Sequence, residues 1–95
     1  MKIICSPEIQ KKLQKKHNVT LEEVEQCFYN RRGLFLEDSR EEHKTDPITQ
    51  YFIAETDRRR KLKVCFVLDG DIHIKTAFDP SENAVAFYKK HALKK

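Results

Sequence analysis

The feature that most constrains this chain is a pair of alternating segments on either side of Asp69-Gly70. Residues 60–68 place an apolar side chain at every second position, and residues 71–78 alternate in a similar way. Side chains of a β-strand point to opposite faces in turn, so each segment predicts a strand with one apolar face. Asp-Gly between two such strands is a strong hairpin signal. The chain is therefore expected to build an antiparallel sheet around this hairpin.

Two registers of the hairpin are compatible with the sequence. A two-residue turn pairs Leu68 with Asp71, whereas a three-residue loop pairs Leu68 with Ile72. A slip of one residue exchanges the two faces of a strand. The longer loop aligns the apolar residues of both strands and is favoured on that ground, although the Asp-Gly dipeptide favours the shorter turn. The favoured register places three residues on the more polar face: Lys63, His73 and Lys75.

Capping signals predict two helices in the N-terminal third. Ser6, followed by proline, is the expected N-cap of a short amphipathic helix that ends near residues 17–18. Thr20 and Glu23 form a capping box at the start of a second helix. Gly33 is the expected left-handed stop of that helix.

The remaining elements complete a small two-layer domain. Residues 34–36 and 48–56 read as strands, and residues 3–4 as a short strand or a packed arm. Asp79 is the expected N-cap of a last helix, in which Tyr88 belongs to the apolar stripe. The predicted fold class is α+β. A small twisted antiparallel sheet, made of a three-strand meander and one short strand, carries two N-terminal helices and one C-terminal helix in a single domain, 1–95.

Composition indicates which partners and which cellular compartment to expect. The net charge of +4 and the pI near 9 permit a polyanionic partner. The three cysteines form no C-x-x-C pair, so reduced thiols are expected rather than a zinc site or a disulfide framework. Apolar runs are too short for a membrane span, and the first residues are too short for a signal-peptide core. We expect a cytoplasmic protein without a cofactor and without a membrane partner.

The connection between the short strand and the meander is the segment richest in reactive groups. In residues 37–46, eight of ten positions are charged or histidine, whereas a simple turn needs about two to five residues. Metal-free RNA cleavage needs a base, an acid and cations that stabilise the phosphorane. The expected catalytic residues are Arg40, Glu41, His43 and Lys75, with Glu42 as an alternative base.

A basic turn and the sheet supply the expected substrate contacts. Residues 58–61 are Arg-Arg-Arg-Lys, which suits an RNA backbone. The candidate substrate-binding residues are Arg59, Arg60, Lys63 and His73. Structural alternatives stay open, because the turn can simply solubilise a hairpin tip and residues 37–46 can be a solvated loop. A metal site at Glu42, His43 and Asp46 has suitable ligand types but matches no known spacing.

The sequence resembles the small toxins of bacterial toxin–antitoxin pairs, in the BrnT-like branch of the RelE-type ribonuclease fold, or a relative of that branch. The resemblance rests on K-H-N-V-T-x-E-E-V at Lys16–Val24, L-F-L-E-D at Leu34–Asp38, the three-strand block at Tyr51–Phe78, and F-Y at Phe87-Tyr88. It covers nearly the whole chain. It implies a messenger-cleaving ribonuclease and a cognate antitoxin protein, often with a ribbon-helix-helix DNA-binding part.

Three functions therefore remain in view. The leading hypothesis is a toxin-like, metal-independent ribonuclease that acts by acid–base chemistry and has RNA as its partner. The second is a non-catalytic protein-interaction module. The third is a hydrolase that acts on a modified protein or nucleotide, suggested by the closeness of Glu41, Glu42 and Asp46 in the sequence.

Overall fold

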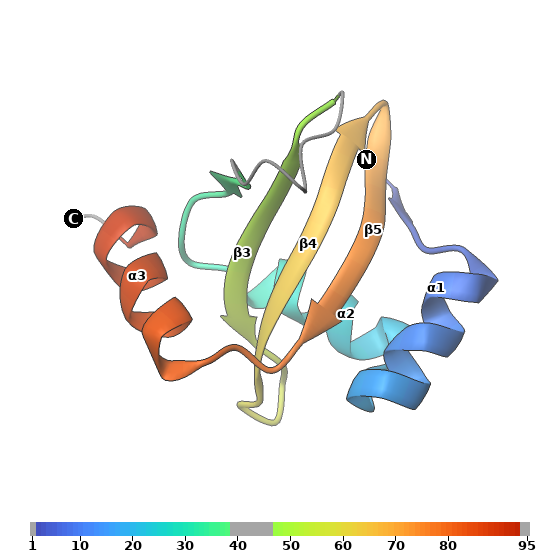
Figure 1. Ribbon diagram of the computed structural model, residues 1–95, viewed down its shortest axis with the longest axis horizontal. Coiled ribbons are helices and arrows are strands. Elements are labelled where there is room, and N and C mark those ends of the chain that lie inside the picture. Colours follow the sequence, from blue (N-terminus) through green and yellow to red (C-terminus); the bar gives the residue numbers. More distant parts are fainter. Residues whose placement is uncertain (1, 39–46, 94–95) are drawn as a thin grey trace.

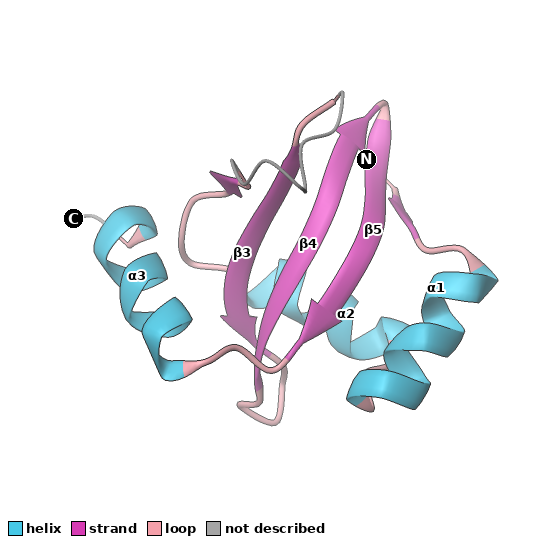
Figure 2. Ribbon diagram, in the orientation of Figure 1, coloured by secondary structure: helices cyan, strands magenta, loops and turns pink. Residues whose placement is uncertain are grey.

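The computed structural model of the chain describes residues 2–38 and 47–93 and has an α+β fold, as predicted (Figure 1). One mixed sheet has the strand order β1-β5-β4-β3-β2. Figure 2 separates its strands from the helices around it. The elements are β1 (Ile3–Ile4), α1 (Pro7–Lys12), the π-helical turn η1 (Leu13–His17), α2 (Leu21–Asn30), β2 (Leu36–Glu37), β3 (Thr49–Glu55), β4 (Lys61–Asp69), β5 (Asp71–Phe78) and α3 (Glu82–Ala92).

The sheet differs from the prediction at its first strand. Strand β1 pairs with β5 in a parallel direction, with Ile3 opposite Ile72, so the sheet has five strands and is mixed rather than purely antiparallel. The backbone N–H of Ile72 donates to the carbonyl of Lys2 at 2.9 Å. The two isoleucines therefore form a short edge strand, which was one of the two alternatives for this segment.

The β4–β5 hairpin adopts the favoured register near its turn and then contains a bulge. Leu68 lies opposite Ile72, and Gly70 occupies the turn with a positive φ of 74°. Farther along, Phe66 lies opposite Ile74, but the next residue, Cys65, lies opposite Thr76. Lys75 is therefore an extra residue in β5. The regular alternation predicted for 71–78 is wrong beyond Ile74, because a bulge changes which side chains face the core.

Helix capping follows the predictions in the N-terminal third. The Ser6 hydroxyl accepts from the backbone N–H of Ile9 at 3.3 Å, and the Thr20–Glu23 capping box is complete in both directions. The predicted N-cap of α3 is wrong. Ser81 caps α3 by accepting from the N–H of Ala84, because the carboxylate of Asp79 is bound elsewhere.

The core lies between the sheet and α2. Cys27 and Val24 of α2 are fully buried, and Phe28 packs on Phe52 of β3 with 4.6 Å between ring centroids. Phe28 also packs on Phe66 of β4 at 5.4 Å. Figure 1 shows α2 behind the sheet in this view. Helix α2 therefore covers one face of the sheet but not the opposite face.

Helix α3 packs beside β3 on the face opposite to α2. Tyr88 is 2% exposed, which confirms that it belongs to the core, and its ring lies 6.3 Å from that of Tyr51. The Tyr88 hydroxyl donates to the carbonyl of Leu34 at 2.7 Å. This bond ties α3 to the connection between α2 and β2.

Gly33 is required for close packing and not for a left-handed turn. Helix α2 ends at Asn30, Arg31 follows in an extended conformation, and Gly33 has no positive φ, so its predicted role as a left-handed stop is wrong. A Cβ atom on Gly33 would lie 2.6 Å from Oη of Tyr88 and 3.0 Å from a methyl carbon of Leu93. Only glycine lets this segment approach α3 so closely.

Among the described residues, none of the helices is both long enough and apolar enough to cross a membrane.

Candidate functional site

Two surfaces on the same side of the sheet carry side chains that are able to bind a ligand or to take part in a reaction. The first is the β4–β5 face, which we define as the side chains of Lys63, Cys65, Val67, His73, Thr76 and Phe78. The register gives these side chains one common face, opposite to the face covered by α2. In Figure 1, none of the described helices lies in front of β4 and β5.

Lys63 on the β4–β5 face lies beside two aromatic rings, those of Phe78 on the same face and of Tyr51 on the adjacent strand β3. The ammonium group of Lys63 lies 4.5 Å from the ring centroid of Tyr51 and 5.8 Å from that of Phe78. The rings of Tyr51 and Phe78 are partly exposed. Lys75 is exposed at the bulge, and bulges often lie beside functional sites.

His73 and Lys63 share this face but lie at different positions along it. His73 lies opposite Val67, whereas Lys63 is four residues farther along β4. At about 3.4 Å per residue, the two are separated by about 14 Å along the strand, too far to bind one phosphate together. Nε2 of His73 lies 3.1 Å from the carbonyl oxygen of Asp69. The face suits an extended ligand better than a single small anion.

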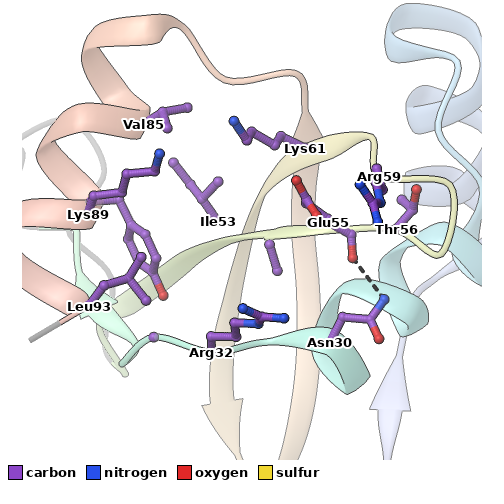
Figure 3. Close-up of a pocket in the computed structure, with 13 residues that line it drawn as sticks. Asn30, Arg32, Ile53, Glu55, Thr56, Arg59, Lys61, Val85, Lys89 and Leu93 are labelled. Carbon is purple, nitrogen blue, oxygen red and sulfur yellow. Dashed lines mark hydrogen bonds between the residues drawn. The ribbon is translucent and has the colours of Figure 1, made fainter. Parts of the chain in front are cut away.

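The second surface is a hollow between α3, β3 and the end of α2, with a volume of about 760 Å³ (Figure 3). Four basic side chains surround it: Arg32, Arg59, Lys61 and Lys89. A shallower hollow shares the last three of these residues and continues along α3 toward Pro80. We call the two hollows together the α3 groove.

The four cations of the α3 groove are all exposed, and none of them forms an ion pair with any residue in the described part of the chain. The carboxylate of Glu55 is the acidic side chain that lines both hollows. Lys61 of the α3 groove adjoins the β4–β5 face, because it lies two residues before Lys63 on the same face of β4. The positive charge of the two surfaces is therefore continuous.

Arg59 enters the groove from a strained backbone. Its φ is 67°, in the left-handed region that disfavours residues with a Cβ. The turn is closed by a bond from the Arg59 N–H to the carbonyl of Thr56, and the Thr56 hydroxyl accepts from the N–H groups of Arg58 and Arg60. Glycine is the favoured residue at such a position.

The guanidinium group of Arg60 is bound within the fold, and its predicted phosphate contact stays a prediction. Its Nε and Nη2 donate to the carboxylate of Asp79, both at 2.9 Å. The other bonds of its guanidinium reach the carbonyls of His17 and Asn18 and the carboxylate of Glu23. Every nitrogen of the side chain is engaged. Arg60 therefore joins the N-terminal helices to the segment that leads into α3.

The structure describes only some of the remaining predicted site residues. Arg40, Glu41 and His43 lie outside the described residues, and so do Glu42 and Asp46 of the alternative metal site. Lys63, His73 and Lys75 lie on the neighbouring strands β4 and β5 but at different positions along them, and Arg59 lines the α3 groove.

The thiols of Cys27 and Cys65 are both buried, although Cys65 belongs to the β4–β5 face. Cys65 is 6% exposed, and Cys27 is fully buried with its Sγ 3.6 Å from the carbonyl of Ala54. Burial, reinforced by the charge of Glu23, raises the pKa of the Cys27 thiol to about 12. A thiol with so high a pKa is a poor nucleophile at neutral pH.

Sequence reasoning missed Arg32, Lys61 and Lys89 as members of one site. Arg32 follows α2, Lys61 begins β4 and Lys89 lies on α3. Each one alone reads as an ordinary surface charge, and only the packing of α3 beside β3 brings them together. No protein-family model matches the chain, and no curated protein matches it.

Proposed function

We propose that this protein binds single-stranded RNA on its β4–β5 face and cleaves it as a toxin-like, metal-independent ribonuclease. The observation that carries the proposal is the placement of the Lys63 ammonium group over the rings of Tyr51 and Phe78 on this face. Proteins that bind single strands combine cations for the phosphates with aromatic rings on which bases stack.

The chemistry of cleavage would use the nucleophile within the substrate. A base removes the proton of the 2′-hydroxyl, whose oxygen attacks the adjacent phosphorus, and an acid protonates the departing 5′-oxygen. The sequence candidates for these steps are Glu41 and His43, with Arg40 as a cation. Lys75, which is exposed at the bulge of β5, would stabilise the charge of the phosphorane.

A cleavage assay in the presence of EDTA tests this function. The purified protein is incubated with ribosome-free RNA, and the new ends are identified. The proposal predicts 2′,3′-cyclic phosphate and 5′-hydroxyl ends. It predicts losses on the order of 10²-fold for His43→Ala, Arg40→Ala and Lys75→Ala. Lys12→Ala, an exposed change on α1, is the control and should leave the rate unchanged.

Two results would sink the catalytic assignment. The first is intact RNA after long incubation with folded wild-type protein. The second is cleavage at the same rate by wild type and by His43→Ala and Arg40→Ala, because a contaminating nuclease would behave in that way.

A further inference from the structure

We propose that the α3 groove is a docking site for an acidic, amphipathic peptide segment of a partner protein. This site adjoins the β4–β5 face but shares none of its residues, and it does not depend on RNA cleavage.

The rim of the groove attracts negative charge from several directions. Lys89 and Arg59 lie on opposite sides of the hollow, with Lys61 above it and Arg32 below it in the view of Figure 3. Glu55 is the acidic residue that lines the larger hollow, and Asp79 and Glu82 also line the shallower one, where Asp79 is already bound by Arg60. Acidic side chains that bind here would gain partners that the described part of the chain does not already provide.

The floor of the groove is apolar and favours a polypeptide over a nucleic acid. Ile53, Val85 and Leu93 line it, and Leu93 remains 40% exposed. Tyr88 is the aromatic residue of the lining, and at 2% exposure it offers no ring face on which a base can stack. Apolar side chains of a peptide would gain burial here, whereas a sugar–phosphate backbone would not.

The length of the groove fits a short extended segment. Helix α3 has eleven residues and is about 16 Å long, which corresponds to about five residues of extended chain. In an extended peptide with alternating acidic and apolar residues, the apolar side chains point to the floor and the carboxylates to the rim. The carbonyl of Glu55 already accepts from Nδ2 of Asn30, so side chains rather than an added strand are expected to supply the contacts.

Arg59 supports a binding role for the rim. An arginine in a left-handed conformation is strained by its Cβ atom, whereas glycine would satisfy the turn without that strain. Strained residues of this kind cluster at binding sites. The side chain of Arg59 contributes to both hollows of the groove, which gives the strain a functional counterpart.

The test measures binding of a fluorescein-labelled peptide, DLELDLE, to the full chain by fluorescence anisotropy. Three changes are compared with wild type. Lys89→Glu and Arg32→Glu should each weaken binding by about tenfold, and Glu55→Gln should strengthen it by about twofold to threefold. Lys12→Glu on α1 is the matched control, since it changes the net charge as much as Lys89→Glu does and should have little effect.

Two competitor ligands separate this site from a general anion surface. The peptide DSESDSE has the same charge without the leucines and should bind about tenfold more weakly. A five-nucleotide oligouridine should not compete for the groove. The proposal is overturned if the serine peptide or the oligouridine binds with equal affinity and equal sensitivity to Lys89→Glu. It is also overturned if Lys12→Glu weakens peptide binding as much as Lys89→Glu does.

Discussion

Arg60 is the residue that holds the most distant parts of the fold together. Its guanidinium binds the carboxylate of Asp79 through two nitrogens and also reaches the carbonyls of His17 and Asn18. Lysine cannot reproduce this planar arrangement of donors. We therefore expect Arg60→Lys to lower the free energy of unfolding by about 1–3 kcal/mol, because two carbonyls lose their charged donor. Urea unfolding at neutral pH measures the change.

The matched control for this prediction is Arg58→Lys. Arg58 is an exposed neighbour in the same turn. The hydrogen bond that it donates to the Thr56 hydroxyl comes from its backbone N–H and not from its side chain. Its replacement should alter stability by less than about 0.5 kcal/mol. Equal effects of the two substitutions would mean that Arg60 has no structural role beyond that of a surface arginine.

Acid sensitivity follows from the same contact. The hydrogen bonds from Arg60 hold the pKa of Asp79 below its ordinary value of 3.8. Because the folded-state pKa is lowered, the stabilisation is present above about pH 4 and is lost as the pH falls through the folded-state pKa. The side chain of Asp79 is 63% exposed, so solvent screens the contact and the contribution is modest.

Asp79→Asn isolates this contribution. The variant should be less stable than wild type at pH 7, and the difference should shrink as the pH is lowered from about 5 to about 2.5. Urea midpoints measured across this range provide the comparison. A constant difference across the range would show that the Asp79 carboxylate does not act through its charge.

Replacing Arg59 by glycine should have opposite effects on the stability of the protein and on its binding of the acidic peptide. We expect Arg59→Gly to raise the free energy of unfolding by about 0.5–1 kcal/mol, because the left-handed conformation costs more than the extra backbone entropy of glycine. The same change should weaken binding of the acidic peptide, since the rim of the α3 groove loses a cation. Thermal unfolding and anisotropy measure the two effects, and a destabilised Arg59→Gly protein would contradict the assignment of strain.

At the scale of elements, the bulge in β5 decides which side chains share a face. Deleting Lys75 should leave the pairs Ile74–Phe66 and Thr76–Cys65 in place and convert the hairpin to a regular ladder. We expect the deletion to fold with a change in stability of about 1 kcal/mol or less, and to cleave RNA as poorly as Lys75→Ala. Circular dichroism and the cleavage assay test both parts. An unfolded deletion variant would contradict the expected register.

The local elements could be predicted well because their signals lie within a few residues. The Thr20–Glu23 capping box and the turn at Gly70 formed as expected. The N-cap of α3 could not be predicted in this way, because the carboxylate of Asp79 is bound by Arg60, which lies far from it in the sequence. The bulge is visible in the spacing of the core residues of β5. Ile74 and Ala77 are both buried although they lie three residues apart, a spacing that a regular strand does not give.

At the scale of the whole molecule, the sheet separates a face that packs on α2 from a face that carries both candidate surfaces. Helix α2 covers one face, and the opposite face holds the β4–β5 face next to the α3 groove. The first has rings beside its cations, whereas the second has an apolar floor without an exposed ring. Packing brings these residues together from distant positions, so the candidate site could be predicted from the sequence only in part, through Lys63, His73, Lys75 and Arg59.

The most direct test of this account is to map where RNA binds on ¹⁵N-labelled protein by NMR. A five-nucleotide 2′-O-methyl oligouridine prevents cleavage, because the nucleophilic hydroxyl is blocked. We predict saturable shifts at the amides of Lys63, His73 and Thr76, which Lys63→Ala weakens, and unchanged signals at Val85 and Leu93. Shifts centred on the α3 groove, or the absence of saturable shifts, would contradict RNA binding on the β4–β5 face.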